Sequence, residues 1–575
     1  MSPTRIAVSL CCEDAGQLAR ETALAIEQGA DLVEWRLDCL ADPAAAVTLL
    51  AEHPHWRGRI IATARRRDEA GPVGGFEADE SARISLLEAV GLQHPGFIDL
   101  ELAAYNASAN IRQKIHLVCA GGEGFLQGPR SQANQLILSA HLFAAADDPA
   151  LAAWVARQAA MLAQCPWAIA KIAAMPASLD QLQTILHVAR QHLPSGQPRA
   201  LIGMGSHGTA SRIAAGRFGL ALSFASLGSN AAAPGQVSLD QMLALYRANG
   251  ITPQTHLYGV VGSPVAHSKS PLMHNRAFGQ AQLNACYLPL HAADPPDARR
   301  LFDRLLTAPD EPWAFHGFSV TIPYKQVLLE WAGDHAPQRV LIDPRAQRIG
   351  AANTAVRTPH GVHVFNSDYH GLAGPLQTAL LRHHPAASPP TAADPARDLF
   401  LSRKSVLLLG AGGTARAALC VAIDAGAEQI TICNRTAARA HELREALTDH
   451  DRPRVHVADW QARNDLARAA SVILNTTSIG MPHATPQAHT PTDSSPLEPG
   501  LLQPHQIVVD AVYADRPTAL LADAHSAGCI CVDGLDILAA QGEAQFLAFT
   551  GQTPPEPFIT SLRADRPRRP SAPAG

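Results

Sequence analysis

The stretch SVLLLGAGGTARAAL, Ser405–Leu419, decides how the second half of the chain folds. The apolar run Val406–Leu409 predicts a buried parallel strand, and a glycine-rich turn leads from it into a helix that begins near Thr414. In the order strand, turn, helix, the free amides at the start of the helix are suited to bind phosphate groups. A glycine turn that serves only close packing is the alternative interpretation.

Three small residues give this turn its predicted chemistry. Gly410 allows the tight turn, Gly412 lets the backbone approach a pyrophosphate, and Ala415 still permits close packing of helix on strand. The predicted dinucleotide contacts are Gly410, Ala411, Gly412, Gly413, Thr414 and Ala415.

The end of the next predicted strand indicates which dinucleotide binds. An NAD site usually carries an acidic residue there, to accept hydrogen bonds from the ribose hydroxyls. This chain instead reads Asn434, Arg435 and Thr436, with Arg439 one helical turn later. A guanidinium suits a 2′-phosphate, so the sequence predicts NADP rather than NAD.

The composition limits the classes of function. A chain of 575 residues is too long for one core, and its net charge of −5 with interspersed acids and bases predicts neither a nucleic-acid partner nor a membrane partner. The N-terminus lacks signal-peptide character and no apolar run has membrane-spanning length, so we expect a cytoplasmic protein. The ten cysteines lack zinc spacing, including the Cys11-Cys12 and Cys529-x-Cys531 pairs, so buried thiols are expected and no metal site.

The first half of the chain alternates short apolar runs with helical stretches from Arg5 to Phe224. Eight such runs predict a (β/α)8 barrel, with the fifth strand placed at Ile115–Cys119 and polar residues at the strand ends forming the active-site mouth. Lys171 lies between apolar residues in WAIAKIAAMP, so we expect a desolvated amine that can attack a ketone as a Schiff-base nucleophile. A structural pair with Glu34 is the alternative.

Residues 1–250 resemble type I 3-dehydroquinate dehydratase in five segments. These are EWRLD (34–38), TARRRDEAG (63–71), AKIAAMP (170–176), MGSHGTASR (204–212) and APGQ (233–236). The resemblance implies that Lys171 forms an imine with 3-dehydroquinate. It also implies that the substrate is held by Glu34, Arg36, Arg65, Glu69, Arg212 and Gln236.

One departure from that family concerns its general acid and base, a histidine at the end of strand five in a stretch resembling SYHDF. Along IHLVCAGGEGFLQGP the position falls on Ala120 or nearer Glu123, and His116 lies too early in the strand to reach the mouth. A serine before APGQ is replaced by Ala232. The sequence therefore predicts a slow dehydratase unless Glu123 substitutes for the histidine, or else a barrel kept for binding or support.

A new set of motifs begins near residue 255. THLYGVVGSPVAHSKSPLMHNRAF predicts a strand, a loop that bears Ser268 and Ser270, and a helix that begins with proline. GFSVTIPYK, IGAANT and FNSDYHG follow, and they supply Lys325, Asn353 and Asp368. A lysine and an aspartate held together can relay the proton that accompanies hydride transfer to a ketone.

With the nucleotide turn, these motifs resemble shikimate dehydrogenase from Leu257 to Gly551. The resemblance implies that Lys325 and Asp368 form the catalytic pair and that Gly534 lies beside the nicotinamide. It implies substrate contacts from Ser268, Ser270, Thr321, Asn353, Asp368, Tyr513 and Gln541. Mild departures from the usual residues of the family occur at Ser319, Ser367 and Ile537.

The expected organisation is therefore a TIM barrel followed by a two-lobed dehydrogenase. We predict a barrel at 1–250, a substrate lobe at 255–375, a Rossmann lobe at 400–535, a returning helix at 536–562 and a disordered tail at 563–575, with proline-rich insertions at 383–398 and 482–500. The resemblances imply dehydration of 3-dehydroquinate to 3-dehydroshikimate, then NADPH-dependent reduction to shikimate. The alternative is a shikimate or quinate dehydrogenase with a catalytically degenerate barrel, and the two serines favour shikimate.

Overall fold

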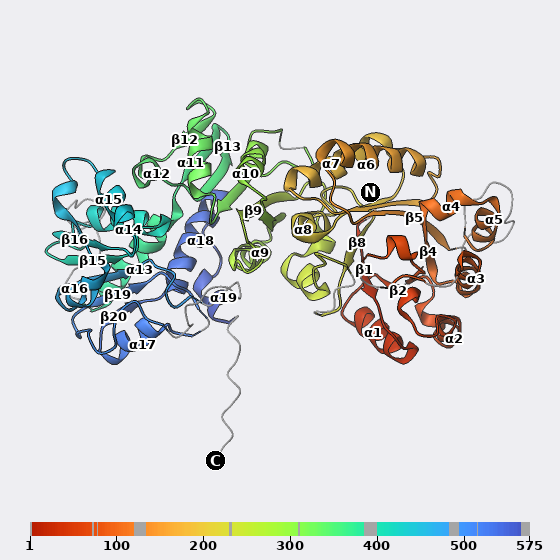
Figure 1. The fold of residues 1–575 in the computed structure, drawn as a ribbon, viewed down its shortest axis with the longest axis horizontal. Helices are drawn as coiled ribbons and strands as arrows, with labels where there is room; N and C mark the ends of the chain where they lie inside the picture. Colours follow the sequence, from red (N-terminus) through yellow and green to blue (C-terminus); the bar gives the residue numbers. More distant parts are fainter. Residues whose placement is uncertain are drawn as a thin grey trace, which may run out of the picture. The chain divides into compact units, whose positions relative to one another are not determined.

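The computed structural model describes nine stretches of the chain and divides it into two compact units (Figure 1). The first unit comprises Met1–Ala266 and Asn284–Phe315, and the second comprises His267–Leu283 and His316–Gly575. The described residues are 3–71, 74–76, 79–119, 134–228, 233–308, 311–383, 400–481, 494–514 and 516–564. The predicted insertions at 383–398 and 482–500 and the predicted tail lie largely outside these residues.

The first unit is built on a parallel eight-stranded sheet in the order β7-β6-β5-β4-β3-β2-β1-β8. The amide of Ala221 donates to the carbonyl of Arg199 at 2.8 Å, which ties β8 back to β7. The predicted barrel is thus confirmed. The strands are β1 (Arg5–Leu10), β2 (Leu32–Arg36), β3 (Ile60–Thr63), β4 (Gly96–Glu101), β5 (Gln135–Leu142), β6 (Ile169–Ala174), β7 (Arg199–Gly203) and β8 (Leu222–Ala225).

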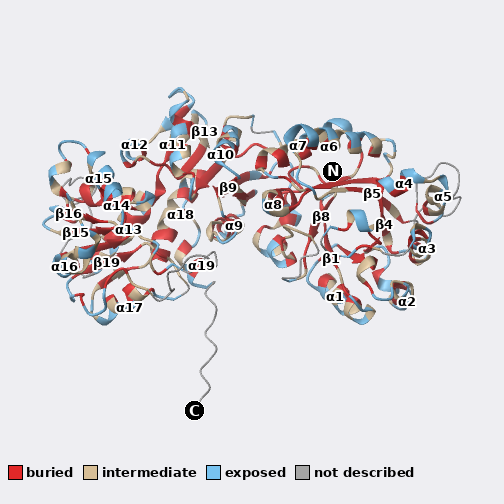
Figure 2. Ribbon diagram, viewed as in Figure 1, coloured by how far each residue is buried: buried red, intermediate tan, exposed pale blue. Residues whose placement is uncertain are grey.

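Alternation along these strands fills the barrel. Every strand contributes at least one apolar residue to a buried inner cluster, and alternate residues further along each strand face the same interior nearer the mouth. Figure 2 shows the strands buried and the outer faces of the helices exposed. The covering helices are α1 (Ala15–Glu27), α2 (Ala45–Glu52), α3 (Glu80–Gly91), α4 (Leu102–Ala107), α5 (Ala109–Val118), α6 (Asp148–Leu162), α7 (Leu179–His192) and α8 (Gly205–Ile213).

The predicted fifth strand is wrong. Ile115 and Val118 lie three residues apart on the buried face of helix α5, which Ser108 caps by accepting from the amide of Asn110. Spacing by three is helical, and a five-residue apolar run does not separate a helix from a strand. The true strand β5 is QLILSAHL, 20 residues further along the chain than the predicted start at Ile115.

Part of the predicted substrate lobe belongs to the first compact unit. Strands β9 (His256–Gly262) and β10 (Ala285–His291) pair in parallel there, and helix α10 (Pro295–Phe302) follows them. The Asp297 carboxylate in α10, 1% exposed, accepts from the amides of Leu179 and Asp180 at 3.2 Å each. It therefore caps the N-terminus of the barrel helix α7.

The second unit contains four strands of the predicted substrate lobe. Strand β13 (Thr354–Thr358) pairs antiparallel with both β11 (Gly317–Val320) and β14 (Gly361–Phe365), and β14 pairs in parallel with β12 (Val340–Ile342). The associated helices are α9 (Ser270–Gln280), α11 (Lys325–Gly333), α12 (Pro344–Ile349) and α13 (Ser367–His383).

The rest of the second unit is a parallel sheet in the order β17-β16-β15-β18-β19-β20. The chain leaves β15 in one direction and later returns to its other side, so the strand order reverses at the end of β15, where dinucleotides bind in this class of sheet. The strands are β15 (Ser405–Leu409), β16 (Gln429–Cys433), β17 (Val455–Ala458), β18 (Val472–Asn475), β19 (Ile507–Asp510) and β20 (Ile530–Val532). The helices are α14 (Gly413–Asp424), α15 (Ala437–Glu445), α16 (Arg463–Ala469), α17 (Ala519–Ser526), α18 (Gly534–Thr550) and α19 (Phe558–Ala564).

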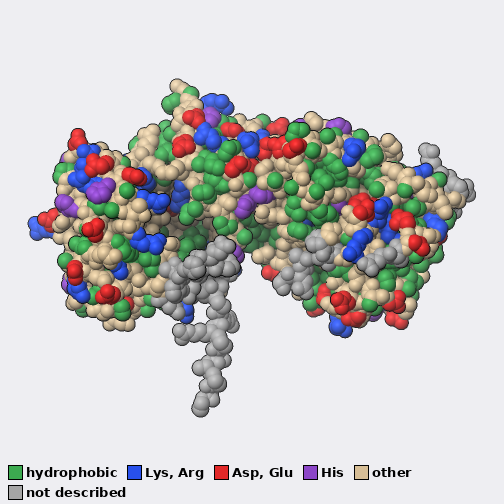
Figure 3. All heavy atoms as spheres, viewed as in Figure 1, with side chains coloured by type: hydrophobic (Ala, Val, Ile, Leu, Met, Phe, Trp, Pro, Cys, Tyr) green, Lys and Arg blue, Asp and Glu red, His purple; other side chains and the backbone are tan. Residues whose placement is uncertain are grey.

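The remaining expectations concern the surface and the cysteines. On the face drawn in Figure 3, acidic and basic side chains are interspersed over both units. None of the described helices is long and apolar enough to cross a membrane, and the described residues hold no cluster of metal-ligating side chains. Cys11 was expected as a thiol, but it forms a disulfide with Cys39, because the ends of β1 and β2 bring the two Cα atoms within 5.4 Å.

Candidate active sites

Lys171 lies inside the barrel on β6, with 4% of its surface exposed. Its Nζ donates to Oδ2 of Asp99 at 2.8 Å and to Oε1 of Glu34 at 3.4 Å. The apolar neighbours seen in the sequence, Ala170 and Ile172, point to the opposite face of the strand. The amine is therefore buried, as the sequence predicted, but it lies between two carboxylates, and Asp99 is closer to it than Glu34 is.

The charges around this lysine are balanced inside the barrel. Nη1 of Arg65 lies 3.0 Å from Oδ1 of Asp99 and 3.3 Å from Oε1 of Glu101. Burial opposes ionisation of Asp99, but Arg65 and Lys171 outweigh it and lower its pKa. Burial likewise opposes ionisation of Glu34, and Lys171 leads the cations that hold its pKa below the ordinary value. Both carboxylates are therefore ionised at neutral pH.

His141 lies at the end of β5, where the sequence predicted that the histidine is lost. Its Nδ1 lies 3.1 Å from Oε2 of Glu69, which also accepts from the backbone amide of His141 at 3.2 Å. Burial, followed by the charges of Arg65 and Lys171, lowers the pKa of His141 well below its ordinary value. The imidazole is therefore neutral at pH 7 and able to accept a proton.

The prediction of a lost histidine is wrong because it rested on the wrong fifth strand. In the true strand, SAHLF at 139–143 places Ser and His as SYHDF does, and this pattern was the available signal. Ile137, Ser139 and His141 alternate along β5 and face the barrel interior in the same way as Ile169, Lys171 and Ala173 on β6. The proposed substitute Glu123, like Ala120 and Ala232, lies outside the described residues.

The predicted dehydratase residues lie around one cavity at the barrel mouth. Arg212, 3% exposed, contributes a guanidinium whose Nε has no hydrogen-bond partner among the described residues, and burial lowers its pKa to about 10. A buried cation with an unused donor is suited to a substrate carboxylate. The cavity is lined by Ser9, Glu34, Arg36, Arg65, Glu69, His141, Lys171, Met204, Arg212, Phe224 and Gln236, among others.

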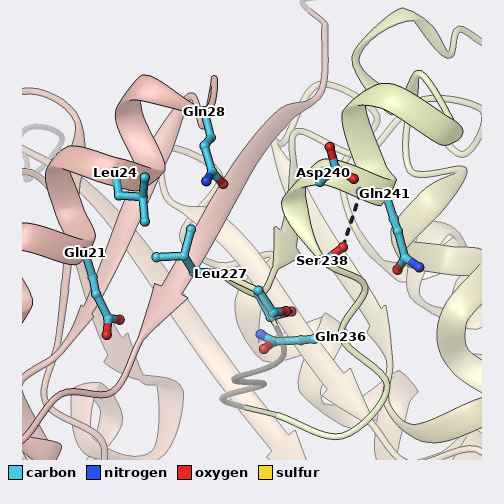
Figure 4. A pocket seen from close by; sticks show the side chains of 10 residues that line it. Glu21, Leu24, Gln28, Leu227, Gln236, Ser238, Asp240 and Gln241 are labelled. Atoms are coloured by element: carbon cyan, nitrogen blue, oxygen red, sulfur yellow. Dashed lines mark hydrogen bonds between the residues drawn. The ribbon is translucent and has the colours of Figure 1, made fainter. Parts of the chain in front are cut away.

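A wider cavity, of about 800 Å³, lies beside α1 and the segment after β8 (Figure 4). Its walls carry the carboxylates of Glu21 and Asp240 together with amides, hydroxyls and two leucines. It shares Gln236 with the mouth, and Nε2 of Gln236 donates to the hydroxyl of Ser9 at 3.3 Å. Among the described residues that line this cavity, no nucleophile is paired with a base, so the smaller cavity at Lys171 is the candidate active site.

In the second unit, Lys325 and Asp368 form the predicted pair. Lys325 opens α11 and Asp368 lies in the first turn of α13, and Nζ donates to Oδ2 at 2.5 Å. Oδ1 of the same carboxylate accepts from Nδ2 of Asn353 at 2.8 Å. Asn353 and Asp368 are buried, with 3% and 6% of their surface exposed, so the pair is held on one side and open at the lysine, whose side chain is 19% exposed.

The other predicted substrate residues also lie in the second unit. The backbone amide of Ser270 donates to the hydroxyl of Ser268 at 3.3 Å where α9 begins. Thr321 follows β11, four residues before Lys325. A Cβ at Gly371 on α13 would lie 3.0 Å from Cβ of Gln541, so α13 and α18 approach closely there. Burial raises the pKa of the Tyr513 phenol and the nearby Lys269 opposes that rise.

The glycine turn has the conformation that a dinucleotide site requires. Gly410 has φ +111°, and a Cβ there would lie 2.6 Å from Oγ1 of Thr476. A Cβ at Gly412 would meet nothing within 4 Å, so this side of the turn is open to a ligand. A Cβ at Gly413 would lie 3.9 Å from Cδ of Lys325, which places the turn next to the catalytic pair.

The two predicted specificity arginines follow β16. Arg435 and Arg439 are exposed, and neither takes part in an ion pair among the residues that the structure describes. The side-chain amide of Asn434 donates to the carbonyl of Thr436 at 2.9 Å and so shapes the loop between strand and helix. The guanidiniums are therefore available to an anionic group. Gly534 lies at the start of α18, where a Cβ would be 2.4 Å from the carbonyl oxygen of Val512.

Three family models match successive parts of the chain. Residues 6–253 match type I 3-dehydroquinase, residues 260–355 match the shikimate dehydrogenase substrate-binding domain, and residues 394–490 match shikimate / quinate 5-dehydrogenase.

Similar proteins cover the same range. A chloroplastic bifunctional 3-dehydroquinate dehydratase/shikimate dehydrogenase from Arabidopsis thaliana is 30% identical over 573 residues, which span 96% of this chain and 83% of that protein. A shikimate dehydrogenase (NADP(+)) from Roseobacter denitrificans is 33% identical over 52% of this chain and 93% of its own length. A solved structure of dehydroquinate dehydratase and shikimate dehydrogenase from S. pombe is 22% identical, covers 98% of each chain and has a TM-score of 0.39.

Proposed function

Because the chain belongs to the family of bifunctional 3-dehydroquinate dehydratase/shikimate dehydrogenases, we propose that it catalyses two consecutive steps toward shikimate. The barrel removes water from 3-dehydroquinate to give 3-dehydroshikimate. The second unit then reduces the ketone of 3-dehydroshikimate to the alcohol of shikimate with NADPH, reversibly. The cytoplasmic location predicted from the sequence stays a prediction.

In the barrel, Lys171 forms the covalent intermediate and His141 transfers the protons. The amine of Lys171, once deprotonated, adds to the substrate ketone, and loss of water from that adduct gives an imine. The protonated imine acidifies the neighbouring C–H bond, and the neutral imidazole of His141 accepts that proton. His141 then protonates the departing hydroxyl, which leaves as water, and hydrolysis of the imine returns the lysine. Arg212 binds the substrate carboxylate.

The observation that carries the dehydratase proposal is that His141 and Lys171 line the same cavity. The test is reduction with borohydride in the presence of 3-dehydroquinate, followed by mass analysis of the peptide that contains Lys171. Wild type should gain the mass of the reduced adduct on Lys171 and should release 3-dehydroshikimate. Lys171→Met should do neither, and a trapped Lys171→Met would show that another amine forms the imine.

In the second unit, the cofactor supplies the hydride when it is bound. The open side of Gly412 and the amides at the start of α14 fit its pyrophosphate, and Arg435 and Arg439 fit the 2′-phosphate. The Lys325 ammonium donates its proton to the substrate oxygen as charge develops there, and the Asp368 carboxylate stabilises the ammonium and orients it. Ser268 and Ser270 bind the substrate carboxylate, and Asn353 a ring hydroxyl.

The observation that carries the dehydrogenase proposal is the Lys325–Asp368 contact beside the glycine turn. Oxidation of shikimate with NADP tests it. Loss of the proton donor in Lys325→Met should lower kcat by about a hundred- to ten-thousand-fold, the range typical of general acid–base catalysis. Arg435→Ala should weaken binding of NADPH far more than of NADH. An equal loss for both cofactors would show that Arg435 does not read the 2′-phosphate.

A further inference from the structure

Gln545 lies directly behind the catalytic pair of the second unit, four residues after the predicted substrate contact Gln541, and the sequence predicted no role for it. It is on α18, with 4% of its surface exposed. Its Nε2 donates to the hydroxyl of Ser367 at 2.9 Å and to that of Thr354 at 3.2 Å. Both hydrogens of the amide are therefore used on two hydroxyl oxygens.

The two hydroxyls that accept from Gln545 donate their own protons to Asn353. A hydroxyl has one proton, so a hydroxyl that accepts from Gln545 can direct its own proton at another acceptor. Ser367 Oγ donates to Oδ1 of Asn353 at 3.1 Å, and Thr354 Oγ1 donates to the same atom at 3.0 Å. The backbone amide of Ser367 adds a third bond to Oδ1 at 2.7 Å.

Three donors on Oδ1 leave one orientation for the Asn353 amide. Nδ2 must then face Oδ1 of Asp368, to which it donates at 2.8 Å. The opposite orientation would place the NH2 group among three donors and a carbonyl oxygen against a carboxylate, and a buried polar group without a partner is costly. The bond from Asn353 thus fixes one oxygen of Asp368 and leaves the other, Oδ2, to Lys325.

A buried histidine lies next to Gln545. His274 on α9 is fully buried and packs among the rings of Phe546, Phe549 and Phe558. Burial lowers the pKa of His274 to about 3, against a smaller opposing effect of the neighbouring Gln545. The imidazole is therefore neutral at working pH and places no charge beside Gln545.

We propose that Gln545 is a positioning residue for hydride transfer, which sets the direction of the hydroxyl protons on Ser367 and Thr354 and thereby the orientation of Asn353 against Asp368. It touches neither substrate nor cofactor in this role, and it acts through the side chains between it and the carboxylate. The inference rests on the proposed reduction of 3-dehydroshikimate at Lys325.

Two variants separate this role from simple packing. Gln545→Met keeps the length of the side chain and removes both donors, so the two hydroxyls are released. Gln545→Glu places a carboxylate that accepts from both hydroxyls and draws their protons away from Asn353. A matched control is Gln506→Met, because Gln506 is equally buried in the same unit and its Nε2 donates to the carbonyls of Ala467 and Ala470 at 2.6 and 2.7 Å.

The experiment measures shikimate oxidation by the full chain across pH, with the melting temperature of each variant. Gln545→Met should lower kcat by about ten- to a hundred-fold, the scale of an ångström-sized misplacement, with little change in the KM for NADP. The pH profile of kcat should also differ from that of the wild type, because the bond from Asn353 no longer holds the Asp368 carboxylate in one position. Gln545→Glu should lower kcat further, and Gln506→Met should change the melting temperature alone.

Two outcomes would overturn the inference. In one, Gln545→Met melts lower in the manner of Gln506→Met but keeps the kcat and the pH profile of the wild type. In the other, Gln545→Glu is as active as the wild type. A wild-type chain that did not oxidise shikimate would instead contradict the proposed function, so the two failures are distinguishable.

Discussion

Neutral His141, which contacts Glu69, is the base of the barrel, and its loss can be measured separately from imine formation. His141→Gln should slow release of 3-dehydroshikimate by about a hundred- to ten-thousand-fold, because the proton transfers lose their carrier. Borohydride should still trap the substrate on Lys171, since the lysine and its carboxylate neighbours are unchanged. Steady-state rates and mass analysis of the trapped peptide measure the two effects.

His116→Gln is the matched control for this variant. His116 lies in helix α5, where its Nε2 is 2.9 Å from the hydroxyl of Tyr105, and it is the histidine inside the strand that the sequence predicted. This change should leave dehydration near the wild-type rate. Equal losses in His116→Gln and His141→Gln would contradict the assignment of the base.

The carboxyl group of Glu69 predicts a pH dependence for the same step. Burial, together with the charge of Glu101, raises the pKa of Glu69 to about 7. Above that pH the ionised carboxylate accepts the N–H of His141 and leaves the other ring nitrogen free to take a proton; below it this preference is lost. We therefore expect kcat/KM for 3-dehydroquinate to rise as pH increases through about 7, the value in the free enzyme.

The carboxyl group of Glu69 should also affect the stability of the fold, which should fall as pH rises, whereas kcat/KM should increase. A folded-state pKa raised from 4.5 to about 7 stabilises the folded state at pH below 4.5 and loses that contribution as pH rises through about 7. Glu69→Gln should weaken the pH dependence of both kcat/KM and the melting temperature. Melting temperatures and rates measured over the same pH range test this. A rate that does not change between pH 6 and pH 8 in the wild type would contradict the role given to Glu69.

At the scale of elements, the contact between α18 and the end of β19 depends on one glycine. A Cβ at Gly534 would lie 2.4 Å from the carbonyl oxygen of Val512 and 2.7 Å from the amide nitrogen of Tyr513. Gly534→Ala should therefore displace the start of α18, lower the melting temperature of the second unit and reduce shikimate oxidation, with dehydration unchanged. Both activities can be assayed in the same preparation.

Gly374→Ala gives the comparison for that variant. Gly374 lies inside α13, where a Cβ would meet nothing within 4 Å, so the added methyl group should stabilise the helix by up to about 1 kcal/mol. If both alanine variants behaved alike, the close approach at Gly534 would not govern the packing of α18.

Some strands and helices could be predicted from the sequence, and others could not. The strand, turn and helix at Gly410 were predicted because a long apolar run, glycines and a helix occur in a fixed order. Strand β5 was misplaced because two short apolar runs, Ile115–Cys119 and Gln135–Leu142, could each form a strand. Because the first run was chosen, His141 was not recognised as a site residue. Asp99 was overlooked for a related reason, since only the register from β4 through β5 to β6 brings it to Lys171.

Gln545 shows a different limit of sequence reasoning. A single amide in an apolar helix carries no motif, and its importance comes from hydroxyls on residues 354 and 367, far away in the sequence. Lys325 and Asp368, in contrast, lie in recognisable segments, so their pairing could be predicted before the structure. Residues that touch substrates were therefore easier to predict than residues that orient them.

At the scale of the molecule, the first compact unit continues past the end of the dehydratase match at residue 253. Asp297→Ala removes an acceptor shared by the amides of Leu179, Asp180 and Ala293. Buried donors without partners cost about 1–3 kcal/mol, so the barrel should unfold at a lower temperature and its dehydratase activity should be lost earlier on heating. Thermal inactivation curves with 3-dehydroquinate measure this.

Asp147→Ala tests whether any helix cap would do the same. Asp147 caps α6 through one bond to the amide of Ala150, so its loss should cost about 1 kcal/mol. If the Asp297→Ala and Asp147→Ala variants lost dehydratase activity at the same temperature, the contact from α10 would contribute little to the stability of α7.

The guanidinium of Arg217 reaches the carbonyls of Pro253 and Glu311, so it holds both ends of a stretch that crosses the boundary between two family matches. A gene cut at that boundary would divide the binding partners of one side chain between two polypeptides. Each product would then have to find the other at cellular concentrations before the barrel regained its full set of contacts. A single reading frame supplies those contacts at a fixed one-to-one ratio, independent of how much protein the cell makes.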